Sequence, residues 1–356
     1  MERFEWKTAV VFGTDALAAL EELAGQRVLV VTDDFLARSG LLDQVSAWLK
    51  GCTVETFTQV VPDPPLEVVA KGVRLVEDFR PDALVAFGGG SPMDCAKAMS
   101  HFSTLRPPLY AIPTTAGTGS EVTSFAVLTD SQKGIKYPLV DDSLLPVLAV
   151  LEPAFLEGVP PAVTADTGMD VLTHAAEAYV ATGATPYSDA LAEKAFSLAW
   201  ENLTAAFGGD REAKANMLLS SNLAGLAFNA AGLGICHGMA HTLGGKYHVP
   251  HGRLNAMLLP HVVRFNAAVE HAAKKYGKLA KSCGLSPTWR TLAFGLDRLR
   301  SQLKLPQKLT ACGVEGKTVR ADADAIASSA LADRCTPANP RTVTAEDVKA
   351  LLKELV

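Results

Sequence analysis

The sequence of 356 residues lacks several features that would assign it to a membrane or secreted class. Its six cysteines include no Cys-x-x-Cys pair, and scattered thiols in a chain of this length favour a reduced protein over a disulfide framework. No uninterrupted apolar run reaches about 18 residues, which disfavours a membrane span. The first residues have no apolar core typical of a signal peptide. We therefore expect a cytoplasmic protein with no membrane partner.

The chain also lacks basic blocks, like-charge tails, internal repeats and low-complexity segments. A formal net charge of −5 gives no general attraction to nucleic acid, so we expect no nucleic-acid partner. Apolar residues make up 48% and charged residues 20%, which is typical of a soluble globular enzyme. The length is large for a single core and favours two domains.

Residues 1–158 are predicted to form an α/β nucleotide-binding domain. Apolar runs predict buried strands at 27–33, 53–57, 83–87 and 109–112, with helices at about 34–49 and 66–79 and an edge strand around 4–11. Because continuous apolar strands alternate with helices, we expect a parallel sheet covered on both faces. After Pro160 and Pro161 the sequence becomes rich in alanine and leucine with helical spacing. Residues 159–356 are therefore predicted to be all-helical.

Two glycine-containing loops follow predicted strands in the first domain. Bare glycine amides at a helix N-terminus attract phosphate, and two such loops at the carboxyl ends of parallel strands form a nucleotide crevice. Pro92 suits the first turn of the next helix, and Asp94 is expected in that turn, where it would favour the helix dipole. The candidate nucleotide-binding residues are Gly88, Gly89, Gly90, Ser91, Thr114, Thr115 and Thr118.

Asp33 ends the strand predicted at 27–33, and two interpretations stay open. An acidic residue here hydrogen-bonds an adenosine ribose and repels a 2′-phosphate, which favours NAD over NADP. Alternatively, Asp33 caps the helix that follows. The usual Gly-x-Gly-x-x-Gly after the first strand is missing, so the common dinucleotide fingerprint is not present.

Histidines are concentrated in the second domain, where five of the eight lie between His237 and His261. Residues four apart share a helix face, so Asp170 lies beside His174, and His237 beside His241. His251 follows in a Pro-His-Gly turn. The pattern predicts a metal site, although spacing does not decide which four of these five side chains are ligands. We expect His248 and His261 to be bystanders, and Cys236 to be a packing residue.

The donor types indicate the chemistry of this site. One carboxylate and three imidazoles suit Fe²⁺ or Zn²⁺, and the lack of cysteine ligands excludes a structural zinc finger. A site of this kind with an open position is catalytic: the metal acts as a Lewis acid on an alcohol oxygen. A nicotinamide then accepts hydride from the carbinol carbon, or donates it to an aldehyde in reverse.

The chain resembles the iron-containing (group III) alcohol dehydrogenases nearly from end to end, and five motifs carry the resemblance: residues 88–97, 112–121, 167–177, 234–244 and 250–256. The resemblance implies a dehydroquinate synthase-like NAD-binding domain followed by an all-α metal-binding domain. It implies Asp170, His174, His237 and His251 as metal ligands, with His241 as a non-ligand histidine beside the substrate and nicotinamide. It also implies NAD preference through Asp33 and a nucleotide contact by Lys136. No ligand position is substituted, which argues against the metal-free maleylacetate reductase branch.

Within this family, residues 133–139, 167–174 and 330–341 are most similar to the 1-propanol dehydrogenases of propanediol-using bacterial microcompartments. This similarity implies an NAD(H)- and Fe²⁺-dependent enzyme that interconverts short-chain primary alcohols and aldehydes, such as 1-propanol and propanal. It implies a homodimer paired through the N-terminal strand, with microcompartment shell or cargo proteins as candidate partners. We see no N-terminal amphipathic extension of the kind used for cargo targeting, so encapsulation is expected from the resemblance alone.

Three other functions remain open at this point. One is an ethanol dehydrogenase of ethanolamine metabolism, and another is a Zn²⁺-dependent polyol dehydrogenase acting on glycerol or a similar substrate. The third is a non-catalytic metal- or nucleotide-binding protein, against which the intact ligand and loop positions argue.

Overall fold

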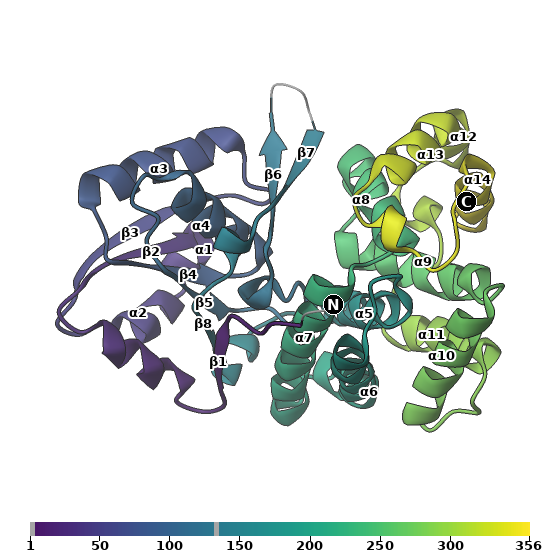
Figure 1. Ribbon diagram of the computed structural model, residues 1–356, viewed down its shortest axis with the longest axis horizontal. Coiled ribbons are helices and arrows are strands. Elements are labelled where there is room, and N and C mark those ends of the chain that lie inside the picture. Colours follow the sequence, from purple (N-terminus) through teal and green to yellow (C-terminus); the bar gives the residue numbers. More distant parts are fainter. Residues whose placement is uncertain (1–3, 132–134) are drawn as a thin grey trace. The chain divides into compact units, whose positions relative to one another are not determined.

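The computed structural model describes the backbone of residues 4–131 and 135–356, and the side chains of 4–131 and 138–356 (Figure 1). The chain divides into two compact units, Met1–Val159 and Pro160–Val356. The first unit contains a parallel β-sheet with flanking helices, and the second is helical throughout its regular structure. The predicted fold class, an α/β domain followed by an all-α domain, is confirmed.

The N-terminal unit is built on a six-stranded sheet in the order β1-β8-β5-β4-β2-β3, in which every pairing is parallel. In sheet order the strands are β1 (Ala9–Phe12), β8 (Leu148–Leu151), β5 (Leu109–Pro113), β4 (Ala83–Gly88), β2 (Arg27–Asp33) and β3 (Thr53–Val60). A separate antiparallel hairpin joins β6 (Phe125–Asp130) to β7 (Ile135–Val140). Neither this hairpin nor β8 is predicted from the sequence.

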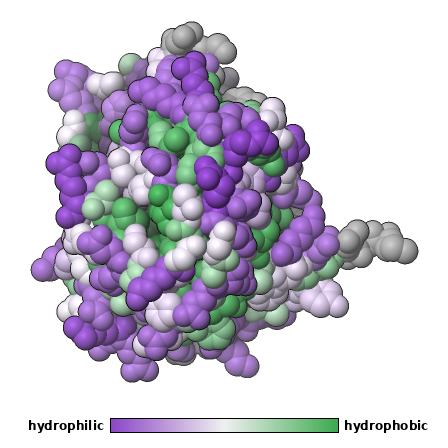
Figure 2. Space-filling model, turned by 90° about the vertical axis from the view of Figure 1, so that its left-hand side faces the viewer, coloured by the Kyte–Doolittle hydropathy of each residue, from purple (hydrophilic) through white to green (hydrophobic). Residues whose placement is uncertain are grey.

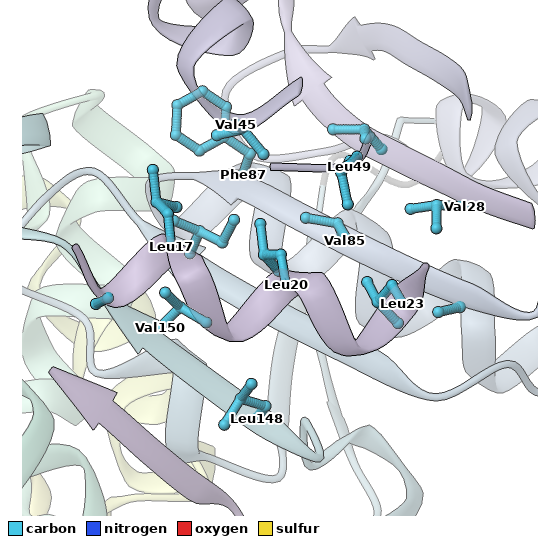
Figure 3. Packing of buried hydrophobic residues seen from close by; sticks show 14 of the residues in the cluster. Leu17, Leu20, Leu23, Val28, Val45, Leu49, Val85, Phe87, Leu148 and Val150 are labelled. Atoms are coloured by element: carbon cyan, nitrogen blue, oxygen red, sulfur yellow. The ribbon is translucent and has the colours of Figure 1, made fainter. Parts of the chain in front are cut away.

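Successive side chains of the central strands point to opposite faces of the sheet, and both sets are apolar, which explains why both faces are covered. In β2, Val28 and Val30 enter one hydrophobic cluster, whereas Leu29 and Val31 enter another on the opposite face. The first cluster is covered by η1 (Ala16–Leu23) and α2 (Leu41–Ser46), and the second by α3 (Leu66–Phe79) and α4 (Gly90–Phe102). Figure 3 shows the leucines of η1 packed among valines of β2, β4 and β8. A strand buried on both faces is apolar throughout, which is the pattern that predicted it.

Two predicted elements differ in detail. The helix expected at 34–49 is divided into α1 (Asp34–Arg38) and α2, because Gly40 has φ +80 and interrupts the helical conformation. The edge strand expected around 4–11 begins only at Ala9. The remaining short helices of this unit are η2 (Ser120–Val122), η3 (Asp142–Leu144) and η4 (Pro153–Leu156).

The C-terminal unit is organised around α5 (Pro161–Val180), which is buried along most of its length. It packs against α6 (Pro186–Phe207), α7 (Arg211–Ala231), α9 (His251–Asn266) and α10 (Glu270–Ser282). Gly168 permits close contact with α6, because an added Cβ would lie 2.1 Å from Leu203 Cδ1. The other helices are α8 (Ile235–Tyr247), α11 (Trp289–Gln302), η5 (Leu309–Cys312), α12 (Gly316–Ala321), α13 (Ala323–Ala332), η6 (Thr336–Ala338) and α14 (Ala345–Glu354).

Among the described residues, no single helix is both long and apolar enough to cross a membrane. Taken together, α7 and α8 have the length and apolar composition of a membrane span, but the chain bends by 106° between them. Both helices bury many residues within the helical unit. Figure 2 shows one face of the molecule, on which hydrophilic residues predominate and hydrophobic residues form separate patches.

Leu20 provides a test of the packing between η1 and the sheet. Its side chain is fully buried in the cluster of Figure 3, so Leu20→Ala should lower the free energy of unfolding by about 2–5 kcal/mol in equilibrium urea denaturation. Leu66→Ala is the matched control, because Leu66 is 38% exposed and should cost less than about 1 kcal/mol. Equal effects of the two substitutions would contradict this packing.

Candidate metal centre and nucleotide-binding loops

Three helices place the four predicted metal ligands close together. α5 carries Asp170 and His174, α8 carries His237, and His251 is the first residue of α9. The Nε2 atoms of His237 and His251 lie 3.6 and 3.4 Å from Asp170 Oδ1. The His174 ring stacks on the His237 ring with centroids 4.5 Å apart. Ligand atoms of Asp170, His174 and His237 all lie within 4.8 Å of one another. The arrangement is a carboxylate oxygen surrounded by imidazoles.

Local chain geometry explains how α8 and α9 meet α5. Only His248, Val249 and Pro250 separate the two helices, and His248 adopts a left-handed conformation with φ +55 that ends α8. At the start of α9, an added Cβ on Gly252 would lie 2.1 Å from the backbone oxygen of Asp166. Glycine at 252 therefore allows α9 to approach α5 within one turn of Asp170.

Burial and neighbouring charges determine the protonation of these groups. Burial by itself raises the pKa of Asp170, but the imidazoles of His174, His251 and His237 outweigh it and hold this pKa well below the ordinary value. Burial lowers the pKa of His237, yet hydrogen bonds to Asp170 and Glu177 raise it to about 9. Desolvation likewise lowers the pKa of His251 well below the ordinary value, although this side chain is only partly buried, and the imidazoles of His241 and His237 act in the same direction. The site therefore favours an ionised carboxylate.

Two buried residues that the sequence analysis did not single out support the ligands. Glu177 Oε2 accepts a 2.6 Å hydrogen bond from His237 Nδ1. Asn255 Nδ2 donates to Asp170 Oδ1 at 2.6 Å and lies 3.1 Å from His251 Nε2. Both residues lie inside recognised motifs, and both are spaced for contact with a ligand: Glu177 is three residues after His174, and Asn255 four after His251. That helical spacing is the signal that would have identified them.

His241 lies beside the ligand cluster and has a different partner. Its Nδ1 is 2.9 Å from Asp333 Oδ2, its ring stacks on His251 at 5.1 Å, and its side chain is 35% exposed. Burial raises the pKa of Asp333, but the hydrogen bond from His241 prevails and lowers it to about 2. His248 is exposed at the end of α8, and His261 lies 3.8 Å from Glu354. Neither belongs to a cluster of metal-ligand type among the described residues.

The two glycine loops of the N-terminal unit lie in contact. Gly88 pairs with Pro113 at the ends of β4 and β5, and its backbone oxygen accepts a bond from Thr114 N–H. An added Cβ on Gly89 would lie 3.4 Å from Thr115 Oγ1, and one on Gly90 would lie 3.1 Å from Thr118 Cγ2. Ser91 Oγ accepts a hydrogen bond from Asp63 N–H at 3.3 Å. The structure thus places the predicted loop residues in one region at the carboxyl ends of adjacent strands.

Asp33 caps α1, since its Oδ1 accepts a 2.8 Å hydrogen bond from Leu36 N–H. This agrees with the capping interpretation and leaves the ribose interpretation a prediction. Lys136 lies in β7, and its side chain is outside the described residues. The placement of Asp94 in the first helical turn is wrong, because α4 begins at Gly90 and Asp94 falls in the second turn.

Asp94 instead joins a buried polar cluster beneath the second loop. It accepts bonds from Ser120 Oγ and Val127 N–H, while Lys97 Nζ donates to Ser120 Oγ and to the backbone oxygens of Thr123 and Phe125. Burial raises the pKa of Asp94 to about 6 and lowers that of Lys97 to about 8. These bonds connect α4, which begins at the first loop, to the chain that leaves the second.

Two family models match the chain: "Iron-containing alcohol dehydrogenase" at residues 7–153 and "Fe-containing alcohol dehydrogenase family, C-terminal" at residues 164–356. The chain belongs to the iron-containing alcohol dehydrogenase family and is therefore an oxidoreductase. It is 42% identical to the 1-propanol dehydrogenase PduQ of Salmonella typhimurium over the full length of both proteins.

Solved structures of relatives have the same fold. An iron-containing alcohol dehydrogenase from Thermococcus thioreducens matches with a TM-score of 0.93 and 33% identity, covering 99% of each chain. A sulfoacetaldehyde reductase from Bifidobacterium kashiwanohense, in complex with NAD⁺, matches with a TM-score of 0.90 and 26% identity, covering 100% of this chain and 98% of that one.

Gly88 and Gly89 offer a matched pair for testing the first loop. Gly88 has φ +151, and an added Cβ would lie 2.5 Å from Pro92 Cγ, so Gly88→Ala combines backbone strain with a steric clash. It should lower the free energy of unfolding by about 1–3 kcal/mol. Gly89→Ala should change it by less than about 1 kcal/mol, because φ is −80 and the nearest atom is 3.4 Å away. Unchanged stability of Gly88→Ala in urea denaturation would refute the assigned loop geometry.

Proposed function

We propose that the protein is an NAD(H)- and Fe²⁺-dependent alcohol dehydrogenase that interconverts short-chain primary alcohols and aldehydes. The observation that carries the proposal is the approach of two imidazole Nε2 atoms to within 3.4–3.6 Å of Asp170 Oδ1, in a member of this family. Burying a carboxylate and several imidazoles together costs free energy, and a ligand bound by all of them would offset that cost. A divalent cation is the partner that this donor set fits.

Asp170, His174, His237 and His251 would hold the metal. One carboxylate with three imidazoles and no thiolate suits Fe²⁺, and it suits Zn²⁺ as well. When bound, the metal supplies a Lewis acid for the alcohol or aldehyde oxygen, and the nicotinamide exchanges hydride with the carbinol carbon. His251 is the most exposed of the four side chains, at 37%, so its side of the cluster is where a small substrate would enter.

The glycine loops would bind the nucleotide. Gly88, Gly89, Gly90 and Ser91 lie at the N-terminus of α4, which attracts a pyrophosphate, and Thr114, Thr115 and Thr118 offer hydroxyl groups from the adjacent loop. An acidic residue at the end of β2 disfavours a 2′-phosphate, so Asp33 supports NAD over NADP. Lys136 is proposed as a further nucleotide contact.

His241 would serve the substrate and nicotinamide rather than the metal. Because Asp333 accepts a hydrogen bond at Nδ1, the ring presents Nε2 as a proton acceptor. A histidine fixed in this way is suited to relaying the proton of the alcohol or to positioning the nicotinamide.

Propanal and 1-propanol are the proposed substrate pair, supported by 42% identity to a relative named 1-propanol dehydrogenase.

We also propose a homodimer: β1 is the terminal strand of its sheet, and an open edge favours pairing with a second copy. Location in the cytoplasm, and inside a microcompartment with shell or cargo proteins, is proposed from the motif resemblance described in the sequence analysis.

The function is tested by anaerobic NADH oxidation over a series of C2–C4 aldehydes and glycerol-derived carbonyls, with the apo-protein reconstituted with Fe²⁺ or Zn²⁺. We expect activity with Fe²⁺ and the highest kcat/KM with propanal. Removing the metal with EDTA should abolish turnover, and the substitution His237→Ala should abolish both metal binding and turnover.

Each alternative has a distinct outcome in this assay. Preference for acetaldehyde would indicate ethanol metabolism, and activity only with Zn²⁺ and a polyol-derived substrate would indicate a polyol dehydrogenase. Full turnover by EDTA-treated protein would rule out the metal-dependent mechanism. Complete inactivity with every aldehyde and Fe²⁺ would instead indicate a binding protein.

His241 is tested separately from the metal ligands. His241→Ala should lower kcat about 100-fold or more, because a positioned proton-transfer group contributes about 10²–10⁴-fold. Metal content should stay at the wild-type level. Asp333→Asn is expected to show a smaller loss, since it keeps the ring but weakens its orientation. Wild-type kcat and an unchanged pH profile in His241→Ala would exclude the proposed role.

A further inference from the structure

Glu177 is a buried carboxylate near the metal centre that contacts no lysine or arginine among the described residues. Its side chain is 1% exposed. Oε1 accepts a 2.7 Å bond from Cys236 N–H, and Oε2 accepts bonds from His237 N–H at 3.3 Å and from His237 Nδ1 at 2.6 Å. All three donors lie in the first turn of α8. An ionised group this deeply buried requires such compensation, and here one ring supplies the shortest bond.

The bond to Nδ1 fixes the imidazole of His237. A carboxylate only accepts hydrogen bonds, so Nδ1 must carry a proton, and Nε2 is the nitrogen whose lone pair the ring would offer to a cation. That Nε2 atom is the one that lies 3.6 Å from Asp170 Oδ1. Glu177 therefore determines both the tautomer of the ring and the direction in which its free nitrogen points.

We propose that Glu177 is a positioning residue of the metal centre, holding His237 in the tautomer and orientation required for coordination through Nε2. The proposal rests on the function proposed above, which supplies the metal. Glu177 is not a member of the cluster formed by Asp170, His174 and His237, and both of its oxygens accept hydrogen bonds from α8. Its negative charge also increases the donor strength of the imidazole toward a cation.

A capping role alone does not explain this arrangement. Capping would require bonds only to the backbone N–H groups at the start of α8. Asn339 also accepts one of these bonds, from Ile235 N–H to its Oδ1 at 3.3 Å. Asn339 therefore stabilises the same helix end without contacting the His237 ring. The two residues separate support of the helix from support of the imidazole.

The experiment measures the affinity of the full-length apo-protein for Co²⁺ and Zn²⁺ by chelator competition, with Co²⁺ visible absorption as a report of ligand geometry. Glu177→Gln keeps the side-chain volume but removes the charge and offers one acceptor oxygen instead of two. We expect its affinity to fall about 10- to 100-fold, with altered Co²⁺ bands. Tm is measured on each apo-protein to confirm folding.

Two controls accompany this variant. Glu193→Gln makes the same chemical change at a carboxylate that bonds Tyr179 in the same unit, and it should leave metal affinity within about 3-fold of wild type. Asn339→Ala should lower Tm of the apo-protein but leave metal affinity similarly unchanged. If Glu177→Gln does not fold, Glu177→Asp, which keeps the charge but withdraws it from Nδ1, replaces it with the same expected loss.

The outcomes separate the two proposals. Wild-type affinity in the Glu177 variants would overturn the positioning role while leaving the metal site intact. An equal loss of affinity in Asn339→Ala would also overturn it, because the effect would then arise from the start of α8. Failure of the wild-type protein to bind Co²⁺, Zn²⁺ or Fe²⁺ would overturn the proposed function, and the positioning role with it.

Discussion

The burial of one negative charge, that of Asp170, is the constraint on which the helical unit depends. A carboxylate that is almost inaccessible to solvent must be compensated, and here the compensation comes from three imidazoles and one amide on three helices. The helices must therefore bring these side chains together around one carboxylate. Small residues make this possible, as at Gly168 between α5 and α6 and at Gly252 between α9 and α5. Packing and electrostatics are satisfied by the same contacts.

The N-terminal unit meets a similar constraint with different chemistry. Lys97 is fully buried and Asp94 partly so, and their hydrogen bonds run almost entirely to the segment that leaves the second glycine loop. Polar hydrogen bonds thus stabilise the carboxyl ends of the strands from which the loops extend, whereas the two faces of the sheet are covered by apolar residues. In both units, buried ionised groups lie next to the segments that are proposed to bind ligands, which is where such costly groups are most often found.

Much of this structure follows from patterns in the sequence, and the exceptions have physical reasons. Four strands of the sheet (β2, β3, β4 and β5) and the helix at 66–79 were predictable because apolar runs and periodicity report burial directly, whereas the short buried strand β8 was missed. The break at Gly40 and the β6–β7 hairpin were not, because a single left-handed residue and a sheet outside the main core leave little periodic signal. The proposed metal ligands were found through i,i+4 spacing and family motifs. Glu177 and Asn255 were missed: their spacing from His174 and His251 indicates only a helix face shared with a ligand, whereas their bonds to His237 and Asp170 run between helices.

The short connection between α8 and α9 affects the order in which the metal-binding side chains come together as the chain folds. His237 and His251 lie on consecutive helices joined by three residues, so they come together early and locally, whereas Asp170 and His174 lie more than sixty residues upstream, beyond α6 and α7. A chain in which α5 has not yet docked on α9 presents only half of the donor set. Full coordination therefore requires the completed helical unit, so uptake of the cation would act as a checkpoint that stabilises only correctly folded molecules.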